Sequence, residues 1–210
     1  MKLYSYYRSS ASYRVRIALN LKGLHADILP VNLLKNEQRG DSYCEVNPQG
    51  LLPALVDQGE VFTQSLAIIE YLEEKYPHPP LLPQSPVERA RARALALAVA
   101  CEIAPICNSG PLNFLGQQFL LNEEQKMQWY HHWLHKGFAA LEQMVQQTSG
   151  TYCHGASPGL ADCFLVPQLY NARRYQCDLT AYPTLTRIGA ACNKHPAFMA
   201  AHPSQQLDAV

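Results

Sequence analysis

The sequence predicts a small α/β domain followed by an all-α domain, and three observations support this. Strand-like and helix-like segments alternate over the first 77 residues. Five of the 15 prolines then fall between positions 77 and 86, where they favour a stiff linker over a helix. Beyond them, apolar residues recur at helical spacing. We therefore expect domains at residues 1–77 and 87–210, joined by a linker at 78–86.

The first domain is built from short elements in the order β-α-β-α-β-β-α. The expected strands cover residues 2–6, 28–33, 51–56 and 61–62, and the expected helices cover residues 13–22, 41–45 and 65–76. The serines at positions 9, 10 and 12 suit the start of the first helix, and Gly23 suits its end. Residues 57–60 form the expected hairpin turn, and Ser65 is the expected cap of the last helix. This is the element order of a thioredoxin-like domain.

Pro53 falls inside the strand expected at 51–56, where a trans proline removes a hydrogen bond from the sheet. A cis Leu52–Pro53 bond is one solution, although only about 5–6% of bonds before proline are cis. An edge strand with a trans proline is the other, and position alone favours it.

The second domain is expected to contain only helices. The predicted helices cover residues 87–106, 123–146, 160–170 and 183–192, and the very apolar segment 160–170 is expected at the centre. The expected core positions of the segment 123–146 are Trp129, Trp133, Phe138, Leu141 and Val145.

Composition excludes several classes of protein. The 17 basic residues balance the 17 acidic ones, which argues against a nucleic-acid partner. The longest apolar run, residues 94–101, is far shorter than the ~20 residues that span a bilayer. The seven cysteines are odd in number and scattered, which favours reduced, mostly buried thiols over a disulfide framework. We therefore expect a soluble protein of the cytoplasm, with no membrane and no nucleic-acid partner.

His131 and His135 stand four residues apart on one predicted helix, which is the spacing of a metal pair. The residue after His131 is another histidine and not the Glu of a metalloprotease, and no third ligand is evident. We favour a solvated helix face over a metal site.

Two helix starts could bind anions. Residues 8–14 follow the first strand, where unpaired backbone N–H groups and hydroxyls favour a negative charge, although these residues taken alone favour ordinary capping. Gln64 and Ser65 begin a second helix, and Leu52 lies between the two starts on a strand edge that could pair with an extended peptide. Such a site suits a small acidic peptide that carries a thiol, and glutathione is such a molecule.

Three segments then show a family resemblance: RSSASYRVRIALNLKG, VNPQGLLPALVDQGEVFTQSLAIIEYLEEKYP and LADCFLVPQLYNARRYQCDLTAYP. Together with the Pro-rich joint, they resemble the zeta class of glutathione transferases over nearly the whole chain. The resemblance implies an N-terminal thioredoxin-like domain, an all-helical glutathione transferase C-terminal domain, a cis Leu52–Pro53 bond and a homodimer, with glutathione held between the domains.

The resemblance also implies roles for particular residues. Ser9 matches the catalytic serine that donates to the glutathione sulfur, and Ser10 would be a secondary donor. Arg8 and Arg174 match arginines that hold the substrate carboxylate, and solvated arginines or structural ion pairs are the less favoured alternative for each. The residues implied to bind the rest of glutathione are Leu52, Pro53, Gln64, Ser65 and Asn108.

The implied function is glutathione-dependent cis–trans isomerisation of a maleyl-type dioxo acid, maleylacetoacetate or maleylpyruvate, in the breakdown of aromatic amino acids or aromatic acids. Ala11 stands where the family usually has Cys, and Gly110 stands where bacterial isomerases commonly have Arg. These departures keep open a general conjugating enzyme or dehalogenase acting on small electrophilic acids. A binding protein without activity is the other alternative, but packing alone does not require Ser9, Gln64 and Arg174 together.

Overall fold

The computed structural model describes residues 1–209 of the chain. Its backbone contacts divide the chain into two compact units. The first joins Met1–Leu82 to residues 193–209, and the second covers Pro83–Cys192. The sequence predicts that residues 193–209 belong with the helical domain, so the structure differs from that prediction at the C-terminal end.

The first unit is a four-stranded mixed sheet with helices. Its strands are β1 (Lys2–Ser5), β2 (Asp27–Pro30), β3 (Ala54–Asp57) and β4 (Glu60–Thr63), and its helices are α1 (Ser10–Leu21), α2 (Asp41–Cys44), α3 (Ser65–Lys75) and α9 (Pro196–Ala201). The strands lie in the order β2-β1-β3-β4, with β1 parallel to β2 and antiparallel to β3. The predicted thioredoxin-like order is confirmed.

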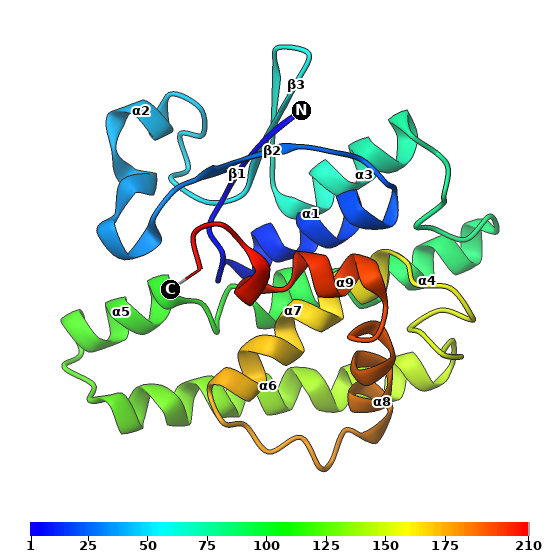
Figure 1. Ribbon diagram of the computed structural model, residues 1–210. Helices are drawn as coiled ribbons and strands as arrows, with labels where there is room; N and C mark the ends of the chain where they lie inside the picture. The colour runs from blue at the N-terminus through cyan, green and yellow to red at the C-terminus, as the bar shows by residue number, and fades with distance from the viewer. Residues whose placement is uncertain (210) are drawn as a thin grey trace. The chain divides into compact units, whose positions relative to one another are not determined.

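Helices α1 and α3 cover one face of the sheet, and α9 lies beside α1 (Figure 1). The predicted inner face of α1 is buried, including Val15, Ala18 and Leu19. Helix α9, which the sequence analysis does not predict, is tied to α1 by polar contacts. Asn20 Nδ2 donates to the carbonyl of Ala197 at 3.0 Å. These contacts explain why the C-terminal segment belongs to the first unit.

A buried ion pair fixes the Pro-rich segment that follows α3. The ammonium of Lys22 lies 2.7 Å from a carboxylate oxygen of Glu73, and the two side chains are 0% and 6% exposed. Lys22 Nζ also donates to the carbonyl of Pro79, and Glu73 accepts from the N–H groups of Leu81 and Leu82. These bonds satisfy both buried charges with backbone partners.

Two local predictions in the first unit need correction. The Leu52–Pro53 bond is cis, but β3 begins only at Ala54, so Pro53 lies outside the strand and removes no bond from the sheet. The cap of α3 is Gln64, at a φ of 65°, and not Ser65, which is the first residue of the helix. The chain turns so sharply out of β4 that the residue before the helix leaves the extended conformation.

The second unit contains only helices in the part of the chain that the structure describes. They are α4 (Pro86–Leu97), a π-helix (Ala98–Ile103), α5 (Ser109–Gln118), α6 (Glu123–Gln146), α7 (Leu160–Arg174) and α8 (Pro183–Cys192). The sequence predicts one helix over 87–106, but the chain changes from α to π at Ala98, and α5 is not predicted at all. None of the helices among residues 1–209 is long and apolar enough to cross a membrane.

Helix α7 is buried at every residue from Leu160 to Leu169, as expected of a central helix. On α6 the buried stripe is Tyr130, Leu134, Phe138, Leu141 and Val145. Trp129 and Trp133 are only half-buried, so the predicted stripe is wrong by one residue in its first half. Gly137 lets the π-helix approach α6, because a Cβ there would lie 2.3 Å from Ile103.

Candidate functional site

The register of the sheet brings three chain segments to one edge of the first unit. Tyr4 of β1 pairs with Ala54 of β3, and Ala54 pairs in turn with Thr63 of β4. The chain therefore leaves β1 toward α1, enters β3 from Pro53, and leaves β4 toward α3 at the same edge. The N-termini of α1 and α3 meet there, and each carries unpaired N–H groups and a partial positive charge.

Ser9 is the N-cap of α1. Its Oγ accepts from the N–H of Ser12 at 3.2 Å, and its own N–H donates to the carbonyl of Tyr6 at 2.9 Å. The side chain is half-buried, and the hydroxyl hydrogen remains available to an acceptor because Oγ acts as an acceptor in the cap. Ser10 begins the helix directly beside it. The predicted helix-start chemistry is confirmed, and the hydroxyl can serve the cap and a ligand together.

Arg8 precedes the cap and is half-buried. Its guanidinium carbon lies 5.1 Å from the centre of the Tyr7 ring, and Nη2 lies 3.4 Å from the hydroxyl of Tyr6. A guanidinium is planar and carries five N–H donors, which is the geometry that binds a carboxylate.

The start of α3 combines an unusual backbone with a buried positive charge. Gln64 has φ 65° and ψ 117°, a sparsely populated conformation for a residue with a side chain. Its Nε2 donates to Oε1 of Gln49 at 2.9 Å. Ser65 is buried, and its Oγ accepts from Nη1 of Arg14 at 3.2 Å. Arg14 is only 4% exposed, so a cation that the sequence analysis does not single out stands beside the second helix start.

Leu52 offers its backbone at this edge. Within residues 1–209 no hydrogen bond is formed by the Leu52 N–H or carbonyl, because the strand begins two residues later. The preceding carbonyl, that of Leu51, is already used, since it accepts from Tyr43 at 2.6 Å and from Asn47 at 2.7 Å. Burial raises the pKa of Tyr43 to about 12, so its hydroxyl stays a donor.

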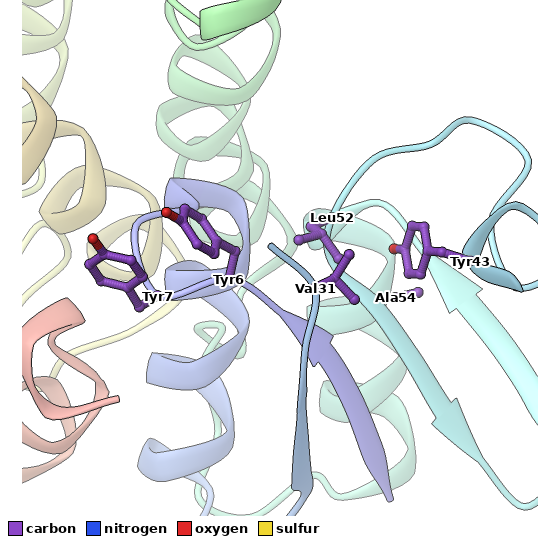
Figure 2. Close-up of a cluster of buried hydrophobic side chains, with 6 residues drawn as sticks. All are labelled: Tyr6, Tyr7, Val31, Tyr43, Leu52 and Ala54. Atoms are coloured by element: carbon purple, nitrogen blue, oxygen red, sulfur yellow. The ribbon is translucent and has the colours of Figure 1, made fainter. Parts of the chain in front are cut away.

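Figure 2 shows the buried side chains that support this edge. Tyr6 and Tyr7 come from the turn after β1, and the other members of this cluster are Val31, Tyr43, Leu52 and Ala54. The C-terminal segment reaches the same place. The N–H of Tyr7 donates to a carboxylate oxygen of Asp208 at 2.9 Å, and Ala209 packs against the cluster.

Gln38 carries a buried polar atom that no pattern in the sequence predicts. Its side-chain oxygen is buried without a hydrogen-bond partner among the described residues. Its backbone carbonyl lies close to Gly50, where an added Cβ would come within 3.0 Å of it. This carbonyl is a different atom from the unpaired Oε1, which is itself buried, so Gln38 is not assigned to the ligand.

The other two predicted site residues belong to the second unit. Asn108 is the N-cap of α5, is exposed, and accepts from the N–H of Ser109 at 2.8 Å. Arg174 is the exposed last residue of α7. Gly110 lies in the first turn of α5, and a Cβ there would meet nothing within 4 Å, so the missing arginine side chain leaves open space.

Neither the histidines nor the cysteines form a metal or disulfide site among the described residues. His131 contacts the carbonyl of Tyr175 at 2.9 Å, and His135 contacts the hydroxyl of Tyr182 at 3.0 Å. Both are half-buried, so the predicted solvated face is wrong, and the two imidazoles bind structural partners instead. Burial raises the pKa of the Cys107 thiol to about 12, which makes it a poor nucleophile.

The edge as a whole suits a small acidic peptide with a thiol. Two helix starts and a buried cation favour carboxylates, an unpaired backbone favours an extended peptide, and a serine hydroxyl can donate to sulfur. A family model for the N-terminal domain of glutathione S-transferases matches residues 3–80, which cover this edge. Fold and match together define the first unit as a glutathione S-transferase N-terminal domain.

The similarity to known proteins extends along the whole chain. A maleylacetoacetate isomerase of Pseudomonas aeruginosa is 52% identical over 99% of this chain and 98% of its own length. The holo structure of a maleylpyruvate isomerase, described as a bacterial glutathione S-transferase of the zeta class, has a TM-score of 0.98 at 46% identity and covers all of both chains. A maleylacetoacetate isomerase of Anaeromyxobacter dehalogenans with glutathione in its active site has a TM-score of 0.90 at 43% identity, over 100% of this chain and 97% of its own. This chain belongs to the zeta class of glutathione S-transferases.

Proposed function

We propose that the protein is a glutathione-dependent cis–trans isomerase of a maleyl-type dioxo acid, either maleylacetoacetate or maleylpyruvate. The observation that carries the proposal is the edge where Ser9, the unpaired Leu52 backbone and the start of α3 converge. Its relatives named as isomerases match over nearly their full length, which supports the same reaction here. We place this activity in the cytoplasm, in the breakdown of aromatic compounds.

In this proposal the first unit binds glutathione. Ser9 donates to the sulfur with Ser10 beside it, and the backbone of Leu52, held by Pro53, pairs with the cysteinyl part. Gln64 and Ser65 bind the γ-glutamyl end, and Asn108 contributes from the second unit. When bound, glutathione supplies the thiolate that adds to the cis double bond and leaves after rotation. A helix N-terminus lowers a thiol pKa by about one to two units, and each unit corresponds to about 1.36 kcal/mol in favour of the thiolate.

Arg8 and Arg174 hold the substrate. A planar guanidinium binds a carboxylate through two parallel hydrogen bonds, so it fixes the acid end while the reacting carbons turn. Ala11 has no thiol, and the nucleophile therefore comes from glutathione and not from this position. We further propose a homodimer, which light scattering would reveal as about twice the 23.5 kDa of one chain.

A glutathione-conjugating enzyme or dehalogenase for small electrophilic acids is the second candidate. The open space beside Gly110 favours it, because one possible carboxylate contact is missing there. The same thiolate would then be consumed and not regenerated.

The ultraviolet absorbance of maleylpyruvate, followed with purified protein and with or without catalytic glutathione, separates the two candidates. Loss of the cis acid only when glutathione is present, with free thiol unchanged at the end, supports the isomerase. Tight glutathione binding by calorimetry without isomerisation of either maleyl acid contradicts it and directs the search to α-halo acids.

A further inference from the structure

Tyr175 directly follows Arg174 and ends helix α7 as its C-cap. Neither the family resemblance nor any sequence motif assigns it a role. The residue is half-buried, whereas Arg174 beside it is exposed. The pair therefore joins an exposed charge to a partly buried ring.

The Tyr175 side chain contacts the Arg174 guanidinium in two ways. Nη2 of Arg174 donates to the Tyr175 hydroxyl at 2.6 Å. The guanidinium carbon also lies 4.5 Å from the centre of the Tyr175 ring, within the range of a cation–π contact. One of the five guanidinium N–H groups is used by the hydroxyl, and four remain for a carboxylate.

Tyr175 is itself held in place from the α6 side. Its ring centre lies 4.4 Å from that of Tyr130, which is fully buried. Its carbonyl contacts Nε2 of His131 at 2.9 Å, and its N–H donates to the carbonyl of Asn171 at 3.0 Å. The Tyr175 ring is thus fixed by the packed interior of the second unit. Its contacts with Arg174 therefore restrict a side chain that would otherwise sample many rotamers.

We propose that Tyr175 is a positioning residue: it orients the Arg174 guanidinium so that the free side of its fork faces a carboxylate. The inference rests on the proposed function, because it assigns Arg174 to the substrate acid. An arginine ordered before binding loses less side-chain entropy when the acid arrives, so the effect belongs in substrate affinity and not in the chemical step.

Tyr175→Phe tests this, because it keeps the ring and removes only the hydroxyl. We expect KM for the cis acid to rise about three- to tenfold, with kcat within about twofold and the affinity for glutathione unchanged. Tyr175→Leu removes both contacts and should raise KM further. The matched control is Tyr182→Phe, which removes a hydroxyl bound to His135 in the same unit and should leave KM unchanged.

A second readout does not depend on turnover. Malonate, a small unreactive dicarboxylate, is titrated into the glutathione-loaded protein by calorimetry, and its Kd should weaken in Tyr175→Phe by the same factor as KM. This measurement separates the Tyr175 proposal from the proposed isomerase function. If the wild-type protein has no isomerase activity but Tyr175→Phe still binds malonate more weakly, the Tyr175 proposal stands. Equal KM and Kd in wild type and Tyr175→Phe overturn it. A joint fall in kcat, glutathione affinity and Tm of Tyr175→Phe would also overturn the proposal, because it would show a structural role. Failure of the wild-type protein to bind malonate would overturn it as well.

Discussion

Ser9 caps α1, and we propose that its hydroxyl also donates to the sulfur of glutathione. Ser9→Ala removes the cap and the sulfur donor together, so we expect a loss of about 1 kcal/mol in stability. Loss of the hydroxyl donor should also raise the pKa of bound glutathione, and each unit of that rise lowers the rate about tenfold near pH 7. Ser9→Thr keeps a hydroxyl and should retain most of both. Equal rates in wild type and Ser9→Ala would exclude the serine from catalysis.

Arg174 should act on the acid and not on glutathione. Arg174→Ala is expected to raise KM for the cis acid more than tenfold, because it removes a bidentate carboxylate contact worth about 1.5–3 kcal/mol. The neighbouring Arg173, also exposed, provides the control Arg173→Ala. Steady-state kinetics measure KM for the acid, and calorimetry measures the affinity for glutathione. If Arg174→Ala weakens both equally, Arg174 does not act on the acid alone.

The Tyr130 hydroxyl is a stability defect in the core. It is fully buried and has no hydrogen-bond partner among the described residues, and burial raises its pKa. Tyr130→Phe should therefore stabilise the protein by about 1 kcal/mol, or raise Tm by about 2–4 °C. Tyr182→Phe removes a hydroxyl that does have partners and should lower Tm instead. A lower Tm for Tyr130→Phe in thermal unfolding would show that the hydroxyl has a partner.

At the scale of elements, the buried pair of Lys22 and Glu73 joins α1 and α3 to the Pro-rich segment. Glu73→Gln leaves a buried ammonium without its counter-charge, which costs about 3 kcal/mol and lowers Tm by about 6–12 °C. Glu74→Gln, at the exposed neighbouring position, is the control. If the two variants melt together, the pair does not stabilise this junction.

The sequence predicts correctly those helices whose ends are marked by residues next to them in the chain. Helix α6 matches its predicted limits, because Asn122 and Gln125 form a capping box at its start. Helix α8 likewise runs from Pro183 to Cys192 as predicted. Helix α5 was missed because Gly110 and Pro111 in its first turn read as a loop.

The site was predictable in part, for a similar reason. Ser9 is visible because a hydroxyl after a strand marks a helix start, which is a local pattern. Arg14 and Tyr175 were not predictable from local patterns. The partner of Arg14, Ser65, is 51 residues away in the sequence, and the ring partner of Tyr175, Tyr130, belongs to a different helix. The tie between α9 and α1 joins residues 177 positions apart and has no local signature.

At the scale of the whole molecule, acid should weaken the fold through Asp57. This carboxylate accepts from Lys75 at 2.7 Å and from Tyr71 at 2.8 Å, and the bond from Lys75 is the main cause that lowers its pKa below the usual 3.8. The contribution to stability is therefore present above pH ~4 and is lost as the pH falls through the folded-state pKa.

Asp57→Asn tests that dependence. The variant should melt below wild type at pH ~7, and the difference in Tm should narrow as the pH falls through the folded-state pKa of Asp57, where the wild-type carboxylate becomes protonated. Thermal unfolding at a series of pH values measures the gap, with the exposed Glu60→Gln as control. If the difference in Tm between wild type and Asp57→Asn does not change with pH, the loss of stability comes from packing and not from charge.

In the proposed reaction, glutathione returns unchanged after each turnover. The measurement is the amount of trans acid formed per glutathione when the acid is present in large excess. We expect many molecules of trans acid for each molecule of glutathione, with the amount of free thiol unchanged at the end of the reaction. Product that stops at one equivalent, with the thiol gone, would contradict the isomerase and identify a conjugating enzyme.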